Sequence, residues 1–289
     1  MASARILTII VAYNGLRWMD SCLGSLRRSE YATDVILIDN CSTDGTPEYV
    51  RAHFPEIMLV LSEENLGFGK ANNIGLRHAL DNGYDYVYLL NQDAWVMPET
   101  LGQLVEAMEA HPEYGILSPV QMTASLERMD RNFQEKCISS SRNYEDGRVY
   151  EVDFVMAAHW MLSRKCLVAV GGFSPVFPHY GEDDNYIHRA YYHGFRTGFL
   201  AGAYAVHDRD ERPYAKETAM KRKLVAARVN VCNPNRSLLR AMILQPVEMF
   251  AIALFHMSWT VIAAIPVLVK EYPFLSACRR QSEDTGAFL

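Results

Sequence analysis

Several common signatures are missing from this 289-residue chain, and each absence excludes a class of protein. The six cysteines form no C-x-x-C pair, which favours reduced thiols in a cytosolic protein over a disulfide framework or a zinc site. There is no G-x-S-x-G and no H-E-x-x-H element, so neither a serine hydrolase nor a zinc protease is supported. The sequence also lacks internal repeats and low-complexity tracts.

Positive charge is scarce overall, and the net charge of -6 argues against a nucleic-acid partner, whose phosphates are gripped by basic surface. Residues 209–240 are an exception, with nine Lys or Arg against three Asp or Glu. No long apolar stretch follows a basic start at the N-terminus, so we expect no secretory signal. Hydrophobic residues make up 49% of the chain, enough to bury a sizeable core.

The first 120 residues alternate between short apolar runs and segments with helical spacing. We expect strands at 6–11, 35–38, 57–61, 86–90 and near 116, and helices at 16–26, 47–53, 68–80 and 98–110. This alternation predicts βαβ units and a parallel sheet, hence an α/β fold. Residues 121–151 are polar and are expected to form an irregular excursion that could cover a substrate. Beyond them we expect a helix from 182 to 193 and short strands from 196 to 206.

Residues 249–269 contain no Asp, Glu, Lys or Arg, and this length could span a bilayer. Polar residues and Pro266 interrupt the run, so a helix or hairpin in the membrane interface and a buried helix on the sheet remain open alternatives. Basic residues beside an apolar helix would attract anionic lipid headgroups at the cytoplasmic face. We therefore expect contact with the inner face of the cell membrane.

Polar residues follow each of the first four predicted strands. They are Tyr13 and Asn14, then Asp39, Asn40, Ser42 and Asp44, then Asn65, Lys70 and Asn73, and finally Asn91, Gln92 and Asp93. Ligands of open α/β sheets bind beyond the carboxyl ends of the strands, so their convergence predicts a ligand site. Each group alone also fits a solvated turn or a helix cap.

Particular residues in this set suit particular chemistry. Asp39 and Asn40 could hydrogen-bond a pyrimidine base on which Tyr13 stacks. The small residues of 65–75 begin a helix whose N–H groups could meet an anion, although the GK[ST] element of a Walker A loop is missing. Asp93 could hold Mg²⁺ or Mn²⁺ and so bridge a diphosphate, or could merely cap a turn.

Two further features suggest catalysis. Glu182, Asp183 and Asp184 open a helix, where a carboxylate could remove the proton of an acceptor hydroxyl. The helix dipole favours acidic residues at such a position in any case. His207 follows a late strand and could bind a metal or a phosphate, although a lone histidine is more often structural.

Together these motifs resemble family 2 glycosyltransferases with the GT-A fold. The resemblance rests on the segments VAYN at 11–14, IDNCSTDGT at 38–46 and NLGFGKANNIG at 65–75. NQD at 91–93 is similar to that family's D-x-D metal motif, and GGF at 171–173 with GEDDN at 181–185 is similar to its acceptor-side ED motif. The resemblance covers residues 6–207. Within the family, the sequence most resembles bacterial rhamnosyltransferase-like proteins, in which the D-x-D motif also often has the form N-x-D.

The resemblance implies a GT-A fold, with a Rossmann-like, mostly parallel sheet flanked by helices and a C-terminal helical, membrane-associated extension. It divides the chain into a nucleotide-sugar-binding half at 1–120, an acceptor-binding half at 121–210 and the extension at 211–289. It also assigns site roles. Tyr13, Asp39 and Asn40 would contact the nucleoside, Lys70 and Asn73 would lie near the nucleotide, Asp93 and His207 would bind Mg²⁺ or Mn²⁺, and Asp183 would be the general base.

The implied function is an inverting transfer of sugar from a nucleoside-diphosphate donor, dTDP-rhamnose or a UDP-sugar, to a hydroxyl of a glycan or lipid-linked acceptor in polysaccharide biosynthesis. Two residues depart from the family pattern: Asn91 replaces the first Asp of D-x-D, and Asn185 replaces an Asp of the ED motif. They keep a non-catalytic nucleotide-sugar-binding scaffold in a membrane assembly open as an alternative. A nucleotidyltransferase is less supported, because no basic Gly-rich triphosphate loop is present near residue 1.

Overall fold

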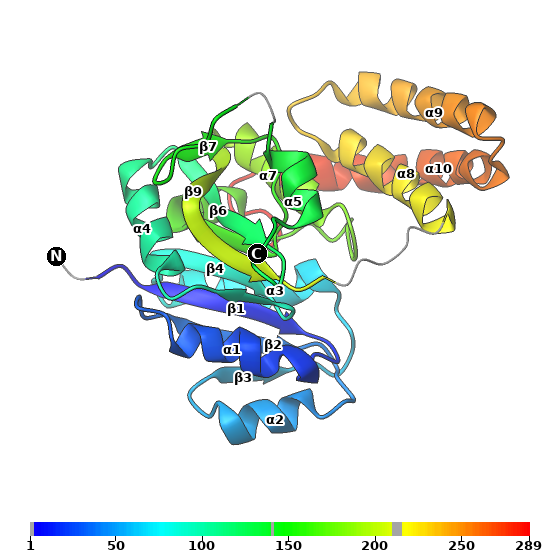
Figure 1. The fold of residues 1–289 in the computed structure, drawn as a ribbon. Helices are drawn as coiled ribbons and strands as arrows, with labels where there is room; N and C mark the ends of the chain where they lie inside the picture. The colour runs from blue at the N-terminus through cyan, green and yellow to red at the C-terminus, as the bar shows by residue number, and fades with distance from the viewer. Residues whose placement is uncertain (1–2, 140–141, 210–215) are drawn as a thin grey trace.

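The computed structural model describes residues 3–139, 142–209 and 216–289, and these form one nine-stranded sheet, helices on both of its faces and a helical extension (Figure 1). The strands are β1 Ile6–Ala12, β2 Asp34–Asp39, β3 Met58–Leu61, β4 Tyr86–Asn91, β5 Ala94–Val96, β6 Tyr114–Met122, β7 Val149–Glu151, β8 His159–Ser163 and β9 Arg196–His207. The helices are α1 Met19–Arg27, α2 Thr46–His53, α3 Phe68–Asp81, α4 Thr100–Ala110, α5 Arg131–Cys137, α6 Arg164–Val170, α7 Glu182–Tyr192, α8 Lys216–Cys232, α9 Leu238–Phe255 and α10 Trp259–Ser282.

The strands are ordered β3-β2-β1-β4-β8-β6-β9-β5, with β7 also paired to β9. β1 to β4 are parallel to one another, β8 is antiparallel to its neighbours β4 and β6, and β6 and β9 are parallel. The sheet is buried on both faces: Ile9 packs into the cluster under α3, α6 and α7, and the next residue, Ile10, packs into the cluster under α1, α2 and α4. Burial on both faces explains the unbroken apolar run of β1.

The predicted α/β class is confirmed, and so is the mostly parallel arrangement of its first half. The second half differs in detail. The short strands expected at 196–206 are one twelve-residue strand, β9, whose pairing with β6 shifts register near Pro119. Gly202, with φ +88°, lies in this irregular part, and the surrounding Gly and Ala residues explain why the sequence suggested several short strands. The polar segment 121–151 contains α5 and β7 rather than irregular chain alone.

The C-terminal extension is a layer of three mutually packed helices, α8, α9 and α10, that projects to one side of the sheet domain (Figure 1). The apolar run 249–269 is divided, because α9 ends at Phe255, α10 begins at Trp259, and Met257 between them has φ +48°. Of the alternatives that the sequence left open, a single helix over 249–269 is not formed, and the segment is a helical hairpin. By length and composition, α9 and α10 are each apolar enough to cross a membrane.

After α10 the chain returns to the sheet domain. The Gly172 N–H donates to the Ala287 carbonyl at 2.8 Å, and the Gly286 N–H donates to the Ala169 carbonyl at 3.1 Å. The Phe288 ring covers the guanidinium of Arg189 at 4.7 Å, and Arg189 is fully buried. The last residues are thus packed into the domain beneath the Gly171-Gly172 turn.

Candidate functional site

The order β3-β2-β1-β4 places a topological switch point between β1 and β4, where ligands of open α/β sheets bind beyond the carboxyl ends. The loops that follow β1 and β2 are joined there by hydrogen bonds. The Asn14 N–H donates to Ser42 Oγ at 2.9 Å, the Thr43 N–H donates to Asn14 Oδ1 at 2.8 Å, and the Leu16 N–H donates to Asp44 Oδ2 at 3.0 Å. This network gives the rim of the site a fixed shape.

Asp39 ends β2 with an unsatisfied acceptor. Its Oδ2 accepts the Ser42 N–H at 3.0 Å, whereas its Oδ1 is buried and has no partner. A buried carboxylate oxygen without a partner is costly, and a ligand donor would relieve that cost. Tyr13 follows Ala12, the register partner of Asp39, and its side chain is 47% exposed. An unpartnered carboxylate oxygen of Asp39 and an exposed tyrosine ring therefore lie at the carboxyl ends of neighbouring strands.

Asn40 has a different environment from the one expected. Its Nδ2 donates to Asn65 Oδ1 at 2.9 Å, and its Oδ1 accepts the Leu66 N–H at 2.7 Å. Both polar groups of the amide thus hold the 65–67 loop against β2, so we assign Asn40 a positioning role rather than a nucleoside contact.

Lys70 and Asn73 lie on α3, and neither side chain joins the residues above. Lys70 is exposed and pairs with Glu64 at 3.6 Å. Asn73 Oδ1 accepts the Phe173 N–H at 2.7 Å, and its Nδ2 donates to the Phe173 carbonyl at 3.0 Å. Asn73 therefore ties α3 to the Gly-Gly-Phe turn, and we leave it out of the proposed nucleotide contacts.

We predict that Asn73→Ala destabilises the fold without changing nucleotide affinity. The substitution leaves the Phe173 N–H and carbonyl without partners, which costs about 1–3 kcal/mol per buried group. Thermal melts should show a clearly lowered Tm, and titration with UDP should give an unchanged Kd. Lys70→Ala, on the same helix but exposed, is the matched control and should keep the wild-type Tm. A weakened UDP affinity with an unchanged Tm would return Asn73 to the nucleotide site.

β4 ends in Asn91, Gln92 and Asp93, and Gln92 has a role that the sequence did not suggest. Its Oε1 accepts the Tyr13 N–H at 2.8 Å, and its Nε2 donates to the Tyr13 carbonyl at 3.2 Å. The side chain thus extends the β1–β4 pairing by one residue and holds Tyr13 in place. Gly15 leaves room for it, because a Cβ at that position would collide with the Gln92 amide.

Asp93 and His207 are brought together by the antiparallel pairing of β5 with β9, in which Ala94 is the register partner of His207. The distance from His207 Nε2 to Asp93 Oδ1 is 3.5 Å, and His207 is buried with an unpartnered Nδ1. Burial acts to raise the pKa of Asp93, but hydrogen bonding and charge from His207, with Arg209 nearby, bring the net pKa below its ordinary value. Asp93 is therefore held in its ionised form.

One divalent ion bound to both atoms at about 2.1 Å would fit a 3.5 Å separation of the two ligand atoms. Within the described residues, no group of three or more His, Cys, Asp or Glu side chains has metal-binding geometry. The pair suits Mg²⁺ or Mn²⁺, which commonly take one or two protein ligands together with phosphate oxygens and water.

A buried histidine, His159, holds the backbone next to this pair. His159 in β8 accepts from Tyr88 Oη at 2.7 Å through Nδ1 and donates from Nε2 to the Val206 carbonyl at 2.9 Å, in the tautomer that these partners require. Burial lowers the pKa of His159 to about 3, so the ring is neutral. It fixes the backbone of β9 directly before His207.

The acidic triplet begins α7, and Gly181, with φ +90°, turns the chain into this helix. Asp183 Oδ2 accepts the Ala157 N–H at 3.1 Å, while the neighbouring Ala158 carbonyl accepts the Asn91 N–H at 3.1 Å. The 157–158 segment therefore connects Asp183 to the end of β4. The triplet and the Asn91-Gln92-Asp93 segment lie at the same edge of the sheet.

Burial, and then repulsion from Asp184, raise the pKa of Asp183 to about 7, against the opposing hydrogen bond from Ala157 and the charge of Arg209. Burial and the neighbouring Asp183 raise the pKa of Glu182 to about 8. Because a general base works best with a pKa near the working pH, Asp183 is suited to proton abstraction. The Arg209 charge acts on both Asp183 and Asp93, so a cation lies near both carboxylates.

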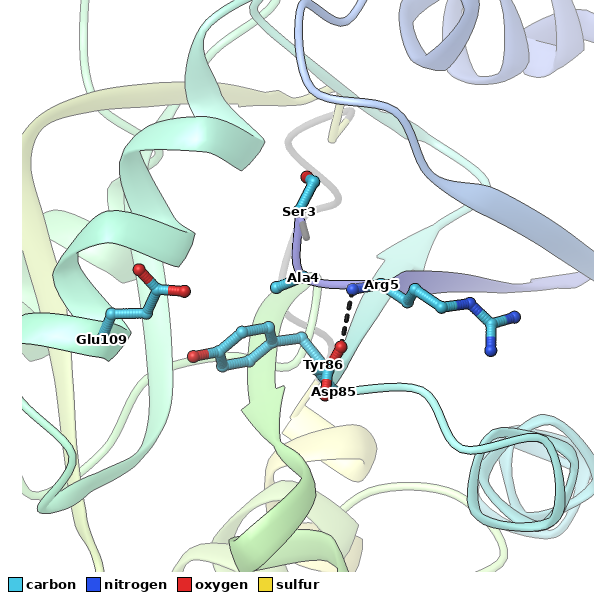
Figure 2. A pocket seen from close by; sticks show the side chains of 6 residues that line it. All are labelled: Ser3, Ala4, Arg5, Asp85, Tyr86 and Glu109. Carbon is cyan, nitrogen blue, oxygen red and sulfur yellow. Dashed lines mark hydrogen bonds between the residues drawn. The ribbon is translucent and has the colours of Figure 1, made fainter. Parts of the chain in front are cut away.

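A separate hollow lies at the opposite edge of the sheet, where β1 and β4 begin (Figure 2). It is lined by Ser3, Ala4, Arg5, Asp85, Tyr86 and Glu109. The Arg5 N–H donates to Asp85 Oδ2 at 2.8 Å, as Figure 2 shows. None of the predicted site residues lines this hollow, and amino ends of parallel strands are not the ligand-binding edge. It is therefore separate from the candidate site.

Comparison with proteins of known sequence gives relatives among bacterial glycosyltransferases. The undecaprenyl-phosphate mannosyltransferase of Micrococcus luteus is 34% identical over 107 residues, which are 36% of this chain and 44% of that protein. The N-acetylglucosaminyl-diphospho-decaprenol L-rhamnosyltransferase of Mycobacterium tuberculosis is 31% identical over 121 residues, 39% of each chain. The matched part spans less than half the length of these relatives.

Solved structures share the fold across nearly the whole chain. TarS 1–349 of S. aureus in complex with UDP superposes with a TM-score of 0.59 at 16% identity, covering 98% of this chain and 89% of that one. The mannosyltransferase PcManGT of Pyrobaculum calidifontis in complex with GDP-Man and Mn²⁺ gives a TM-score of 0.58 at 19% identity, covering 96% and 86%. The GT-A fold inferred from the sequence motifs is thereby confirmed.

A family-level match agrees with the site geometry. Residues 8–169 match the family described as glycosyl transferase family 2, and this segment is more than half of the chain. It includes most of β1, all of β2 to β4, and Tyr13, Asp39 and Asp93 at their carboxyl ends. The chain belongs to glycosyl transferase family 2.

Proposed function

We propose that this protein is an inverting glycosyltransferase that moves a sugar from a nucleoside-diphosphate donor to a hydroxyl of a glycan or lipid-linked acceptor. Family membership supports the reaction class. The observation that carries the proposal is the placement of the ionised Asp93 beside His207, and of Asp183 with its raised pKa, at one edge of the sheet. Transfer with inversion requires one group that stabilises the charge of the leaving diphosphate and one base that deprotonates the acceptor. Residues at this edge could fill both roles.

On the donor side, the unpartnered Asp39 Oδ1 would accept from the nucleoside, and Tyr13 would stack on the base. Asp93 and His207 would hold Mg²⁺ or Mn²⁺, which when bound supplies positive charge to the leaving diphosphate. Mn²⁺ is present in the PcManGT complex with GDP-Man. Arg209 would add a protein cation near the same oxygens.

On the acceptor side, Asp183 would take the proton of the attacking hydroxyl as that oxygen approaches the anomeric carbon. The Ala157 N–H holds one carboxylate oxygen of Asp183, which would leave the other oxygen to accept the proton. A single displacement by the acceptor oxygen needs no covalent nucleophile and inverts the anomeric centre.

The names of two relatives guide the substrate proposal. One is an undecaprenyl-phosphate mannosyltransferase, and the other transfers L-rhamnose to a decaprenol-linked acceptor. We infer a polyprenyl-linked acceptor and a role in polysaccharide biosynthesis at the cytoplasmic face of the membrane, reached through the C-terminal extension. dTDP-rhamnose and a UDP-sugar are the donors to test first.

A screen of nucleoside diphosphates by thermal shift, with and without Mn²⁺, tests the donor site. A ligand that binds only the folded state at 100 times its Kd stabilises the protein by about 2.7 kcal/mol. We expect dTDP or UDP to raise the Tm by several degrees with Mn²⁺ and by much less without it. Adenosine monophosphate, which lacks the diphosphate, is the control. If none of the diphosphates raises the Tm, the donor-site assignment is wrong.

A non-catalytic nucleotide-sugar-binding scaffold remains the second candidate, favoured by Asn91 and by Asn185, whose buried Oδ1 has no partner. The two candidates differ in turnover. Incubation with a panel of nucleotide sugars, Mn²⁺ and polyprenyl-diphosphate acceptors should release nucleoside diphosphate from the enzyme. Binding without release across the panel would support the scaffold.

A further inference from the structure

The turn between α9 and α10 is the most apolar exposed part of the extension. Phe255, Met257 and Trp259 are 85%, 88% and 81% exposed, the highest values among the exposed large hydrophobic residues of the described chain. We call residues 254–259 the hairpin tip. Apolar side chains gathered at one exposed site mark a surface that a membrane or another molecule covers.

Both ends of the hairpin are fixed to the sheet domain, so its tip points away from it. Just before α9, Asn235 Nδ2 donates to the His188 carbonyl of α7 at 2.6 Å. At the end of α10, the Ser282 carbonyl lies 3.3 Å from His193 Nε2. The extension therefore holds the tip at its far end (Figure 1).

Charged residues limit how far this tip can enter a bilayer. Glu248 on α9 and Lys270 on α10 are exposed, and they mark the two ends of the uncharged run 249–269. At 1.5 Å per residue, the uncharged arm of α9 is about 10 Å long and that of α10 about 16 Å. The hydrocarbon core of a bilayer is about 30 Å thick. Both arms fit within one leaflet, and neither can cross without burying a charge.

The helix beside the hairpin supplies charge that suits anionic lipid. Cys232 Sγ contacts the Leu275 carbonyl and Arg228 pairs with Glu271, so α8 runs parallel to α10. The first half of α8 therefore lies beside the tip half of α10. Residues 216–228 contain five Lys or Arg and one Glu. A basic helix at that level would meet headgroups only if the two arms stay outside the acyl region, so the tip alone enters it.

We propose that the hairpin tip inserts into one leaflet of an anionic membrane, with the basic half of α8 at the headgroup level, and that the hairpin crosses no bilayer. This inference rests on the membrane contact of the proposed function but not on the sugar transfer. It explains how the protein would reach a polyprenyl-linked acceptor without the hairpin crossing the bilayer.

Flotation of the full chain with phosphatidylcholine vesicles, with and without phosphatidylglycerol, tests the proposal. We expect strong binding only with phosphatidylglycerol, and at least tenfold weaker partition for Phe255→Glu and for Trp259→Glu. Leu239→Glu is the matched control, because Leu239 is 71% exposed on the same helix but lies at its opposite end. Its partition should stay within about threefold of wild type. All variants should keep the wild-type circular dichroism spectrum.

A thiol-labelling experiment tests whether the hairpin crosses. Met257→Cys should not react with an impermeant maleimide trapped inside the vesicles, and labelling from the inside would overturn the one-leaflet proposal. Equal losses at Leu239 and at the tip would mean that α9 lies flat. Unchanged binding of the tip variants, or a lipid-free dimer that they dissociate, would reject the membrane assignment. The diphosphate-induced thermal shift of the tip variants reports separately on the donor site.

Discussion

Asp183→Asn is expected to reduce the rate of sugar transfer by about 10²–10⁴-fold, the usual contribution of a general base. Asparagine keeps the shape of the side chain and can accept the Ala157 N–H, but it cannot take a proton from the acceptor hydroxyl. Diphosphate affinity with Mn²⁺ should stay near the wild-type value, because the donor contacts are on other loops. Single-turnover assays with a saturating donor measure the loss.

The neighbouring carboxylate offers a matched control. Asp184→Asn removes the same charge from the same helix turn and should lose less than tenfold in rate. If the two variants lose equally, the effect is due to the charge of the triplet, and Asp183 is not the base. Wild-type turnover in Asp183→Asn would contradict the mechanism outright.

The pH dependence of the same residue gives an independent check. Because burial raises the pKa of Asp183 to about 7, the base is protonated below that pH, and the rate should rise as pH increases through 7. The stability of the fold should change with pH in the opposite direction to the rate. A carboxyl whose folded pKa lies above its unfolded pKa favours folding at low pH and loses that stability as pH rises through the folded pKa. Asp183→Asn should therefore melt at a higher temperature than wild type at pH 8, which separates lost catalysis from misfolding.

Asp93→Ala is expected to remove the Mn²⁺ dependence of diphosphate binding and to reduce transfer by about 10²-fold or more, since a metal ion contributes several kcal/mol to the transition state. The substitution deletes the ionised partner of His207 at the 3.5 Å pair. Thermal shift with UDP should then be the same with and without Mn²⁺. His207→Ala should show the same pattern to a smaller degree.

Asp208→Asn is the control for this pair. Asp208 follows His207 and donates its backbone N–H to the Asp93 carbonyl at 2.8 Å, but its carboxylate accepts the Trp18 Nε1–H at 3.2 Å. It should retain the Mn²⁺-dependent shift. A normal Mn²⁺ response in Asp93→Ala would show that the ion is held elsewhere or is not used.

The parts of the fold that the sequence predicts are those with strong local signals. β1 to β4 are apolar runs between helices with clear periodicity, and their order along the chain determines which polar residues meet at one edge. β5 was missed because Ala94–Val96 is only three residues long and its pairing partner is 111 residues or so downstream, beyond any local pattern. That short strand is what brings Asp93 to His207.

The candidate site shows the same division. Residue type and position, at the end of a strand for Asp39 and Asp93 and at the start of a helix for Asp183, predicted three carboxylates as site residues. The same reasoning did not separate Asn40 from Gln92, because whether an amide binds a ligand or the backbone depends on long-range contacts. Those contacts exist only in the folded chain. Arg209 was missed because a single arginine in a basic segment carries no local signal.

The return of the chain after α10 has a practical consequence for work with this protein. A fragment cut before α8 to improve solubility would lose Ala287, whose carbonyl accepts the Gly172 N–H. It would also lose the Phe288 ring that covers Arg189. The buried guanidinium, which belongs to the same helix as Asp183, would be opened to water. Polar substitutions confined to the hairpin tip are therefore the safer route to a detergent-free preparation.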